Sequence, residues 1–331
     1  MNQSHYENIK SYFEQEKEQN QTLWSVTCLE GTHAGEKKLM YGNEMPEHLQ
    51  TGVSKVDGSM VFAEEVQSLP VCVICGAGHV GIPMIRLASF AGFEVVVVED
   101  RPEFANQARK AGADRVICDS FENGLEEIAG GQQTYFVVMT RGHRYDEVCL
   151  KMILKKPYAY TGMMASRGRA ARMRALLLKQ GVSQEKIEGI HSPIGLSIHA
   201  KTPEEIAISV VAQMIEVKNS SGAGAFCDRE ILEAIIQKQG EEPWVLATII
   251  RRAGSAPRDV GTKMLLTETG STIGSVGGGC MEAEVIRSAR LWLKEKKAPV
   301  KIITADMSGV QAEDTGMVCG GRIEVLLEVI E

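Results

Sequence analysis

Several features that would place this chain in a common protein class are missing from its sequence. It has no long basic run, and its net charge of −7 over 331 residues argues against a general nucleic-acid binder. No apolar run approaches the roughly 20 residues of a membrane span. Residues 5–20 are polar and charged, without the apolar core of a secretion signal. These absences predict a soluble cytoplasmic protein without nucleic-acid or membrane partners.

Paired cysteines are equally scarce. The eight cysteines are scattered, and the one close pair, Cys72 and Cys75, falls in a stretch that reads as a buried strand. Without an export signal, reduced thiols are expected. No cluster of cysteines and histidines supplies four zinc ligands, so we predict no metal site. For Cys72, Cys75, Cys118 and Cys149, on predicted strands or helices, we predict packing roles.

The middle of the chain alternates short strands with helices. Residues 69–218 contain apolar runs at 71–75, 94–98, 115–117, 135–139 and 158–161, each followed by a helical pattern. This alternation predicts an α/β domain of Rossmann type, with a parallel sheet covered on both faces. Residues 219–225 have the small, flexible composition of a linker. Residues 226–331 then form a smaller α+β domain with loops rich in glycine and cysteine.

Residues 1–68 predict a helix followed by strands, and they resemble a reduced copy of the last domain. Trp24–Thr27 and Lys37–Leu39 match Trp244–Ala247 and Lys263–Leu265, and the strand at 60–65 matches the one at 323–328. Chance similarity between two amphipathic pieces is the alternative. If the repeat is real, the first copy has lost the glycine–cysteine loops, and we assign it a structural role.

A dinucleotide fingerprint follows the first strand of the central domain. Gly76, Gly78 and Gly81 form G-x-G-x-x-G between a strand and a helix, and Glu99 and Asp100 end the next strand. In such a turn the glycines allow a pyrophosphate to approach the helix N-terminus, and an acid can bind ribose hydroxyls. The sequence therefore predicts a nucleotide site. Arg101, beside the acids, leaves the choice between NAD and NADP open.

Further candidates follow the fourth and fifth strands, at the edge where open sheets bind ligands. Thr140 and His143 follow the fourth strand, and Ser166 and Arg167 open the helix after the fifth. They suit a ligand or phosphate, although loop hydrogen bonds and a solvated basic face are equal alternatives. For Arg172 and Arg174 we favour the solvated face. No spacing marks hydride-transfer machinery.

Two glycine-rich segments carry cysteines in the last domain. Gly277, Gly278 and Gly279 precede Cys280 at the start of a predicted helix, and Cys319 precedes Gly320 and Gly321. Consecutive glycines expose backbone N–H groups to an anion, and a helix N-terminus favours a thiolate. The glycines could instead make hairpin turns around packed cysteines. We predict functional roles for Cys280 and Cys319.

These segments together resemble the xanthine dehydrogenase accessory factor family, also called the XdhC/CoxI family, from residue 71 onward. Besides the fingerprint and the two glycine–cysteine loops, the matching segments are 99–102, Ser166-Arg167, 191–196, 202–207, 254–258 and 319–325. The resemblance implies an accessory factor that binds the molybdenum cofactor (molybdopterin) and aids its sulfuration. The cofactor would then pass to a molybdenum hydroxylase apoenzyme. A cysteine desulfurase would donate the sulfur, which suits a soft thiolate beside an anion-binding loop.

The resemblance assigns roles and leaves alternatives. Cys280 and Cys319 are the candidate thiol contacts, and Arg258, Lys263 and Arg322 the candidate phosphate partners. In the family the glycine–cysteine domain commonly comes first, whereas here it comes last, which points to a subgroup with a different client. The alternatives are an NAD(P)-dependent oxidoreductase and a non-catalytic nucleotide sensor, and whether the chain is an enzyme stays open. A homodimer is the base-rate expectation.

Overall fold

The computed structural model describes residues 2–15, 22–46, 49–56, 58–67, 69–220, 229–240, 242–256, 258–267, 269–295, 298–306 and 321–330. The chain divides into two compact units. One is formed by Ser68–Gly224, and the other combines Met1–Gln67 with Ala225–Glu331. The first and last parts of the chain therefore fold together. Among the described residues, none of the helices has the length and apolar character needed to cross a bilayer.

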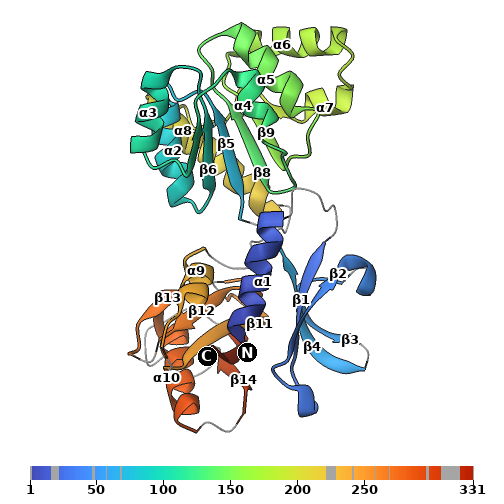
Figure 1. Ribbon diagram of the computed structural model, residues 1–331, viewed down its shortest axis with the longest axis vertical. Coiled ribbons are helices and arrows are strands. Elements are labelled where there is room, and N and C mark those ends of the chain that lie inside the picture. The colour runs from blue at the N-terminus through green and yellow to red at the C-terminus, as the bar shows by residue number, and fades with distance from the viewer. Residues whose placement is uncertain are drawn as a thin grey trace. The chain divides into compact units, whose positions relative to one another are not determined.

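The unit Ser68–Gly224 is built on a six-stranded parallel sheet (Figure 1). Its strands are β5 (Val71–Cys75), β6 (Glu94–Val98), β7 (Arg115–Ile117), β8 (Thr134–Val138), β9 (Tyr160–Met163) and β10 (Ile190–His191). Their order is β10-β9-β8-β5-β6-β7, which is the doubly wound Rossmann order. The strand order reverses between β5 and β8, so the loop after β5 lies at the crevice where such folds bind ligands. The predicted Rossmann-type fold is confirmed.

Helices cover both faces of this sheet (Figure 1). They are α2 (Gly81–Phe90), α3 (Pro102–Lys110), α4 (Phe121–Glu126), α5 (His143–Ile153), α6 (Arg167–Lys179), α7 (Gln184–Glu188) and α8 (Pro203–Ser220). One apolar cluster joins α2, α3 and α8 to the sheet, and a second joins α4, α5 and α6 to its other face. Strands buried on both sides need continuous apolar runs, and β6 supplies four consecutive valines after Glu94.

The N-terminal part of the other unit begins with α1 (Asn2–Gln15) and continues into an antiparallel sheet. Its strands are β1 (Leu23–Cys28), β2 (Lys37–Tyr41), β3 (Gly52–Val56) and β4 (Ser59–Val66), in the order β2-β1-β4-β3. Two short 3-10 turns, η1 (Gly31–His33) and η2 (Gly42–Glu44), lie in its loops. Strand β3 was absent from the prediction because residues 52–56 include a glycine and a lysine and lack a long apolar run.

The C-terminal part of this unit has a five-stranded antiparallel sheet in the order β13-β12-β11-β15-β14. Its elements are α9 (Arg229–Gln237), β11 (Trp244–Gly254), β12 (Lys263–Leu266), β13 (Thr272–Gly274), α10 (Gly279–Glu295), β14 (Val300–Asp306) and β15 (Gly321–Ile330). Helix α10 packs on the sheet through Val285, Ala289 and Trp292, which recur at helical spacing. The helix predicted after the glycines starts at Gly279, so Cys280 belongs to its first turn.

Candidate functional site

The glycine loop after β5 has one position left open for a ligand. A Cβ on Gly76 would lie 2.7 Å from the carbonyl oxygen of Met139, and one on Gly81 would lie 2.5 Å from the oxygen of Gly76. Both glycines are therefore required by close backbone packing. Gly78, by contrast, has no heavy atom within 4 Å of its Cβ position. The middle glycine faces open space, where the pyrophosphate of a dinucleotide approaches in this fold.

Glu99 has a different role from the predicted ribose contact. Its side chain is fully buried, and its Oε2 accepts a hydrogen bond from the backbone N–H of Ala77 at 2.8 Å. The same carboxylate accepts hydrogen bonds from the Arg101 backbone N–H at 3.2 Å and from Arg101 Nε at 2.7 Å. Because both oxygens are bound within the protein, this carboxylate fixes the glycine loop and is poorly placed to face a ribose.

Two arginines near Glu99 stack on aromatic rings. The Arg101 guanidinium lies 3.6 Å from the centre of the Phe104 ring, and that of Arg141 lies 4.5 Å from the centre of the Tyr145 ring. Arg141 also donates to Asp100 at 2.8 Å, and this hydrogen bond lowers the pKa of the Asp100 carboxyl. Both side chains are partly exposed, Arg101 at 32% and Arg141 at 38%. Sequence reasoning left Arg141 without a role, because nothing in a single sequence pairs residue 141 with residue 100.

Thr140 is used inside the protein. Its hydroxyl donates to Asp146 at 2.6 Å, and Asp146, fully buried, forms an ion pair with Arg169. This chain of contacts ties the end of β8 to the helices α5 and α6. Thr140 thus positions the loop that carries Arg141.

The remaining predictions at this edge fall into three cases. The Ser166 hydroxyl caps α6 by accepting from the Arg169 backbone N–H at 3.3 Å. Arg167 is exposed at the first position of that helix. The side chain of His143 lies outside the described residues. Ser166 is thus occupied as a cap, while Arg167 is free to face solvent.

A groove of about 590 Å³ lies beside the glycine loop. Gly78 and the exposed His79 border it, together with Ile82, Pro83, Arg86, Leu87, Phe104, Gln107, Glu204 and Ile208 from α2, α3 and α8. Phe104 is shared with the Arg101 stack. Its lining combines apolar side chains with the polar side chains of His79, Arg86, Gln107 and Glu204, and small-molecule sites use such a combination.

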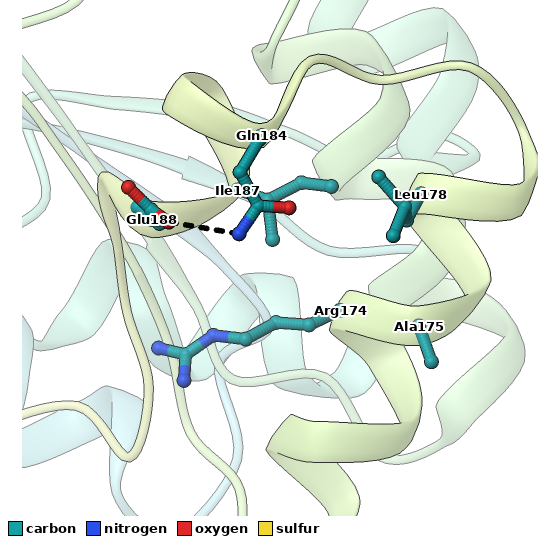
Figure 2. Close-up of a pocket in the computed structure, with 6 residues that line it drawn as sticks. All are labelled: Arg174, Ala175, Leu178, Gln184, Ile187 and Glu188. Carbon is teal, nitrogen blue, oxygen red and sulfur yellow. Dashed lines mark hydrogen bonds between the residues drawn. The ribbon is translucent and has the colours of Figure 1, made fainter.

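A second groove, of about 380 Å³, lies between α6 and α7 (Figure 2). Arg174 extends across it, and Gln184 donates to Glu188 at its side at 2.8 Å. The Arg174 guanidinium donates to the carbonyl oxygens of Ile190 and Ser192 at 3.0 and 3.1 Å. Arg174 therefore holds the segment after β10, which corrects the expectation of a solvated arginine. Arg172 is exposed as predicted.

The segment 191–196, which carries part of the family resemblance, connects the last strand to α8. The Tyr160 hydroxyl donates to Gln213 Oε1 at 2.7 Å, and the Gly195 backbone N–H donates to the same oxygen at 2.9 Å. His191 stacks on Tyr160 with ring centres 4.6 Å apart, and burial lowers its pKa. Gly195 has a φ of 92°, and its Cβ position lies 2.3 Å from Ser209 Oγ. These contacts give the segment a packing role.

In the other unit, the loop before α10 has the predicted open geometry. Gly277, Gly278 and Gly279 all have positive φ angles, of 138°, 70° and 61°, which favour glycine. Cys280 follows in the first turn of α10 and is partly exposed. The thiol is therefore accessible beside backbone donors.

A carboxylate of the protein occupies one of these backbone donors. Glu282 Oε2 accepts from the Gly278 backbone N–H at 3.3 Å and from the Ser275 hydroxyl at 2.5 Å. Gly277 N–H donates to the Ser275 hydroxyl oxygen at 3.2 Å. An incoming anion would therefore replace Glu282 or bind next to it, a competition that sequence reasoning missed.

The second glycine segment lies at the end of β11. Gly321 opposes Gly254 in the β11–β15 ladder, and its Cβ position lies 2.7 Å from the backbone nitrogen of Ala256. Ala256 packs against the cluster that contains Val276 and Met281, so both glycine segments approach one end of the domain. Arg258 and Arg322 are exposed. Cys319 lies outside the described residues.

Lys263 has a different role from the predicted phosphate contact. It is buried, at 3% exposure, and its ammonium group forms an ion pair with Glu64. It also donates to the carbonyl oxygen of Gly261 at 3.2 Å. The ammonium is therefore committed within the protein.

The other described cysteines differ in burial. Cys72, Cys75 and Cys149 are buried, and burial raises the pKa of the Cys72 thiol. Cys118 is exposed, which corrects its predicted packing role. It follows the last residue of the short edge strand β7, where the sheet no longer covers it.

Comparison with known proteins agrees with this division. The XdhC Rossmann domain model matches residues 72–214, and the XdhC and CoxI family model matches residues 237–304. An uncharacterized protein, YqeB, of Escherichia coli strain K12 is 29% identical over 189 residues, which are 56% of this chain and 35% of that protein. A probable subunit of the xanthine dehydrogenase of Bacillus subtilis strain 168 is 28% identical over 158 residues, 48% of this chain and 46% of that protein. The chain thus spans less than half of either curated relative.

The crystal structure of a xanthine dehydrogenase from Bacillus halodurans is similar, with a TM-score of 0.52 and 25% identity, covering 67% of each chain. Of the two family models, one falls on each compact unit. They cover more than half of the chain between them, and on this ground the chain belongs to the XdhC and CoxI family.

Proposed function

We propose that this protein is an accessory factor in the maturation of a molybdenum hydroxylase related to xanthine dehydrogenase. Family membership supports this role, as do relatives whose names include xanthine dehydrogenase. In this role the protein binds the molybdenum cofactor as cargo, assists its sulfuration and passes it to the apoenzyme. Its partners are that apoenzyme and a cysteine desulfurase.

The observation that carries the proposal is the accessible Cys280 beside the three-glycine loop. The cofactor has a phosphate and a soft dithiolene-bound metal, so it needs anion donors and tolerates a thiolate neighbour. The Gly278 N–H and the Ser275 hydroxyl offer donors, and Cys280 offers sulfur. Arg258 and Arg322 are exposed and add positive charge, whereas Lys263 is held in a buried ion pair with Glu64.

Glu282 gives this site a means of release. Its carboxylate binds the same donors that a cofactor phosphate would use. When cargo leaves, the carboxylate satisfies the N–H group and hydroxyl, so the empty loop does not lose its geometry. Binding and release then exchange one anion for another on the same donors.

A nucleotide site in the Rossmann unit is the second part of the proposal. The open space over Gly78 favours a nucleotide, and the partly exposed guanidiniums of Arg101 and Arg141, which are paired with Glu99 and Asp100, retain donors for a phosphate near the end of β6. These donors suit the additional phosphate of NADP, and Glu99, committed to Ala77 and Arg101, does not compete for the ribose of NAD. The same observation supports an NAD(P)-dependent oxidoreductase as the alternative function.

Copurification tests the cargo. The protein is isolated from cells that make molybdopterin, and bound pterin is measured by fluorescence after oxidation, with metal analysis of the same sample. We expect pterin with the wild type and less with Cys280→Ser or Cys319→Ser. Cys118→Ser, which replaces an exposed thiol of the other unit, is the matched control.

The outcomes separate the hypotheses. Equal pterin in both site variants removes the thiols from the mechanism, and no pterin in the wild type refutes cofactor binding. Loss of nicotinamide absorbance with a substrate, in a preparation free of pterin, would support the oxidoreductase.

A further inference from the structure

The sheets at the two ends of the chain have the same connectivity. Strands β2-β1-β4-β3 and strands β12-β11-β15-β14 are paired in the same order, and all the pairs are antiparallel. A helix precedes each sheet, α1 in one case and α9 in the other. The extra elements β13 and α10 lie between β12 and β14 only.

The registers identify equivalent residues in the two sheets. Thr27 opposes Lys37 across β1 and β2, and Thr248 opposes Lys263 across β11 and β12. Two residues before each threonine, Ser25 opposes Glu64 and Leu246 opposes Glu328. Lys37 is therefore the equivalent of Lys263, and Glu64 is the equivalent of Glu328. Residues 24–27 and 60–65 thus correspond to 245–248 and 324–329, one residue later than the sequence match placed them.

These equivalent residues form ion pairs crosswise. Lys37 of the first sheet lies 2.9 Å from Glu328 of the second, and Lys263 of the second sheet pairs with Glu64 of the first. All four side chains are at most 5% exposed. A crosswise exchange of equivalent partners is what a two-fold axis between two copies produces. Because the four side chains are buried, neither ion pair is an incidental contact between surface residues.

Backbone contacts repeat the exchange. Gly35 and Gly261 each precede the equivalent lysine by two residues. The Cβ position of Gly35 lies 3.0 Å from Val300, at the start of β14, and that of Gly261 lies 3.6 Å from Thr51, just before β3. Val53 opposes Phe62 and Ile302 opposes Leu326, so Thr51 and Val300 are themselves equivalent.

Apolar residues fill the space between the copies. Val66 and Ile330, which are equivalent by register, belong to one buried cluster with residues of α1 and α9. Phe62 and Leu326, also equivalent, belong to another. The face that joins the copies thus has an apolar part and two buried ion pairs, a composition that specifies one partner geometry.

We infer that residues 23–66 and 244–330 are two copies of one β-module, joined through a face that is complementary to itself. The N-terminal copy takes the position that a second copy of the C-terminal module would take. It carries only residues 42–51 where the C-terminal copy carries residues 267–299 with the glycine loop and Cys280. The pair therefore has one site-bearing module and one that serves as a built-in partner.

The inference has a measurable consequence for assembly. If the N-terminal copy is prevented from pairing, the C-terminal module of a second chain should replace it, held by two pairs between Lys263 and Glu328. The variant Lys37→Glu with Glu64→Lys places like charges opposite Glu328 and Lys263, which is costly in a buried site. Light scattering after gel filtration should then give twice the wild-type mass.

The rescue variant adds Glu328→Lys and Lys263→Glu to the first two changes. It restores opposite charges in both crosswise pairs, and we expect the wild-type mass and most of the wild-type urea midpoint. Inversion of the exposed pair Glu284 and Arg287, on α10, is the matched control and should leave the mass unchanged.

A cysteine probe covers the case in which the first variant folds poorly. Residues next to a two-fold axis face their own equivalents, and the equivalent residues Phe62 and Leu326 share one buried cluster. Leu326→Cys in the charge-inverted background should therefore form a disulfide between chains on oxidation. In the wild-type background the same substitution should not, because Phe62 shares its cluster. The inference is overturned if the quadruple variant, with Glu328→Lys and Lys263→Glu added, has a urea midpoint as low as that of the double variant Lys37→Glu/Glu64→Lys. It is also overturned if the double variant keeps the wild-type mass and Leu326→Cys in its background forms no interchain disulfide.

Discussion

Glu99 and Ala77 are joined by a hydrogen bond of 2.8 Å that runs from the end of β6 to the glycine loop after β5. The carboxylate is fully buried and also binds Arg101, so one side chain fixes both the loop and the position of an exposed cation. An acid at this point of a Rossmann sheet would ordinarily be assigned to a ribose. Here it supports the loop that receives the ligand.

Replacement of Glu99 by alanine should therefore destabilise the Rossmann unit. The Ala77 N–H would lose its acceptor and Arg101 its ion pair, a loss of about 1–3 kcal/mol. All three tryptophans, Trp24, Trp244 and Trp292, lie in the other unit, so hydrogen exchange of the β5 amides is the appropriate measurement. Glu126→Ala, an exposed carboxylate on α4, should change exchange little. Equal protection in both variants would contradict the role assigned to Glu99.

Two substitutions in the glycine loop should affect different properties, one the stability of the Rossmann unit and the other the binding of NADP. Gly81→Ala brings a methyl group against the Gly76 carbonyl, and we expect a loss of about 1–3 kcal/mol in the Rossmann unit. Gly78→Ala meets no protein atom, so folding should be preserved. Its methyl group would occupy the pyrophosphate position and weaken NADP binding at least tenfold, measured by calorimetry. Unchanged affinity in Gly78→Ala would place any nucleotide elsewhere.

Most of the central fold could be predicted because its elements have local signals; the two-residue strand β10 has none and was not predicted. Strands β5, β6 and β8 each contain at least four consecutive apolar residues, and the glycine fingerprint marks the turn after β5. Local signals fail for partners distant in sequence. Nothing near Lys263 indicates that it is buried against Glu64, and nothing near Arg141 indicates Asp100. The sequence therefore identifies Lys263 and Arg141 only as charged residues and does not identify their partners.

The same limit applies to the glycine–cysteine loop. Its open backbone follows from three consecutive glycines and could be predicted. The binding of one of its donors by Glu282 could not, because a glutamate in the first turn of a helix is common and its position in the sequence does not identify the groups from which it accepts. Loop geometry is a property of the residues in the loop, whereas loop occupancy depends on which side chains compete for it.

Thiol labelling should divide the cysteines by burial. Cys118 and Cys280 should react with iodoacetamide in the native protein, since they are exposed and partly exposed. Cys72 and Cys149 should react only after unfolding, because they are buried and their pKa values are raised, for Cys149 chiefly by a hydrogen bond with Cys75. Peptide mass spectrometry at pH 8 distinguishes the sites. Native labelling of Cys72 ahead of Cys280 would contradict the exposure of the α10 thiol.

His5 should make the stability of the two-module unit depend on pH. It is buried beside Ser25, 3.0 Å from its hydroxyl, and burial, followed by Lys37 and Lys263, lowers its pKa from 6.5 to about 3. Between these values the unfolded chain binds a proton that the folded chain does not, so stability falls as pH decreases.

The size of the effect follows from the two pKa values. Between pH 7 and pH 5 the wild type should lose about 2 kcal/mol more than His5→Gln, in which the group cannot titrate. Because every tryptophan belongs to this unit, urea unfolding followed by tryptophan fluorescence measures it directly. His33→Gln, at an exposed histidine of the same unit, should keep the wild-type slope. Parallel pH profiles for the wild type and His5→Gln would show that α1 does not bury His5 against the first sheet.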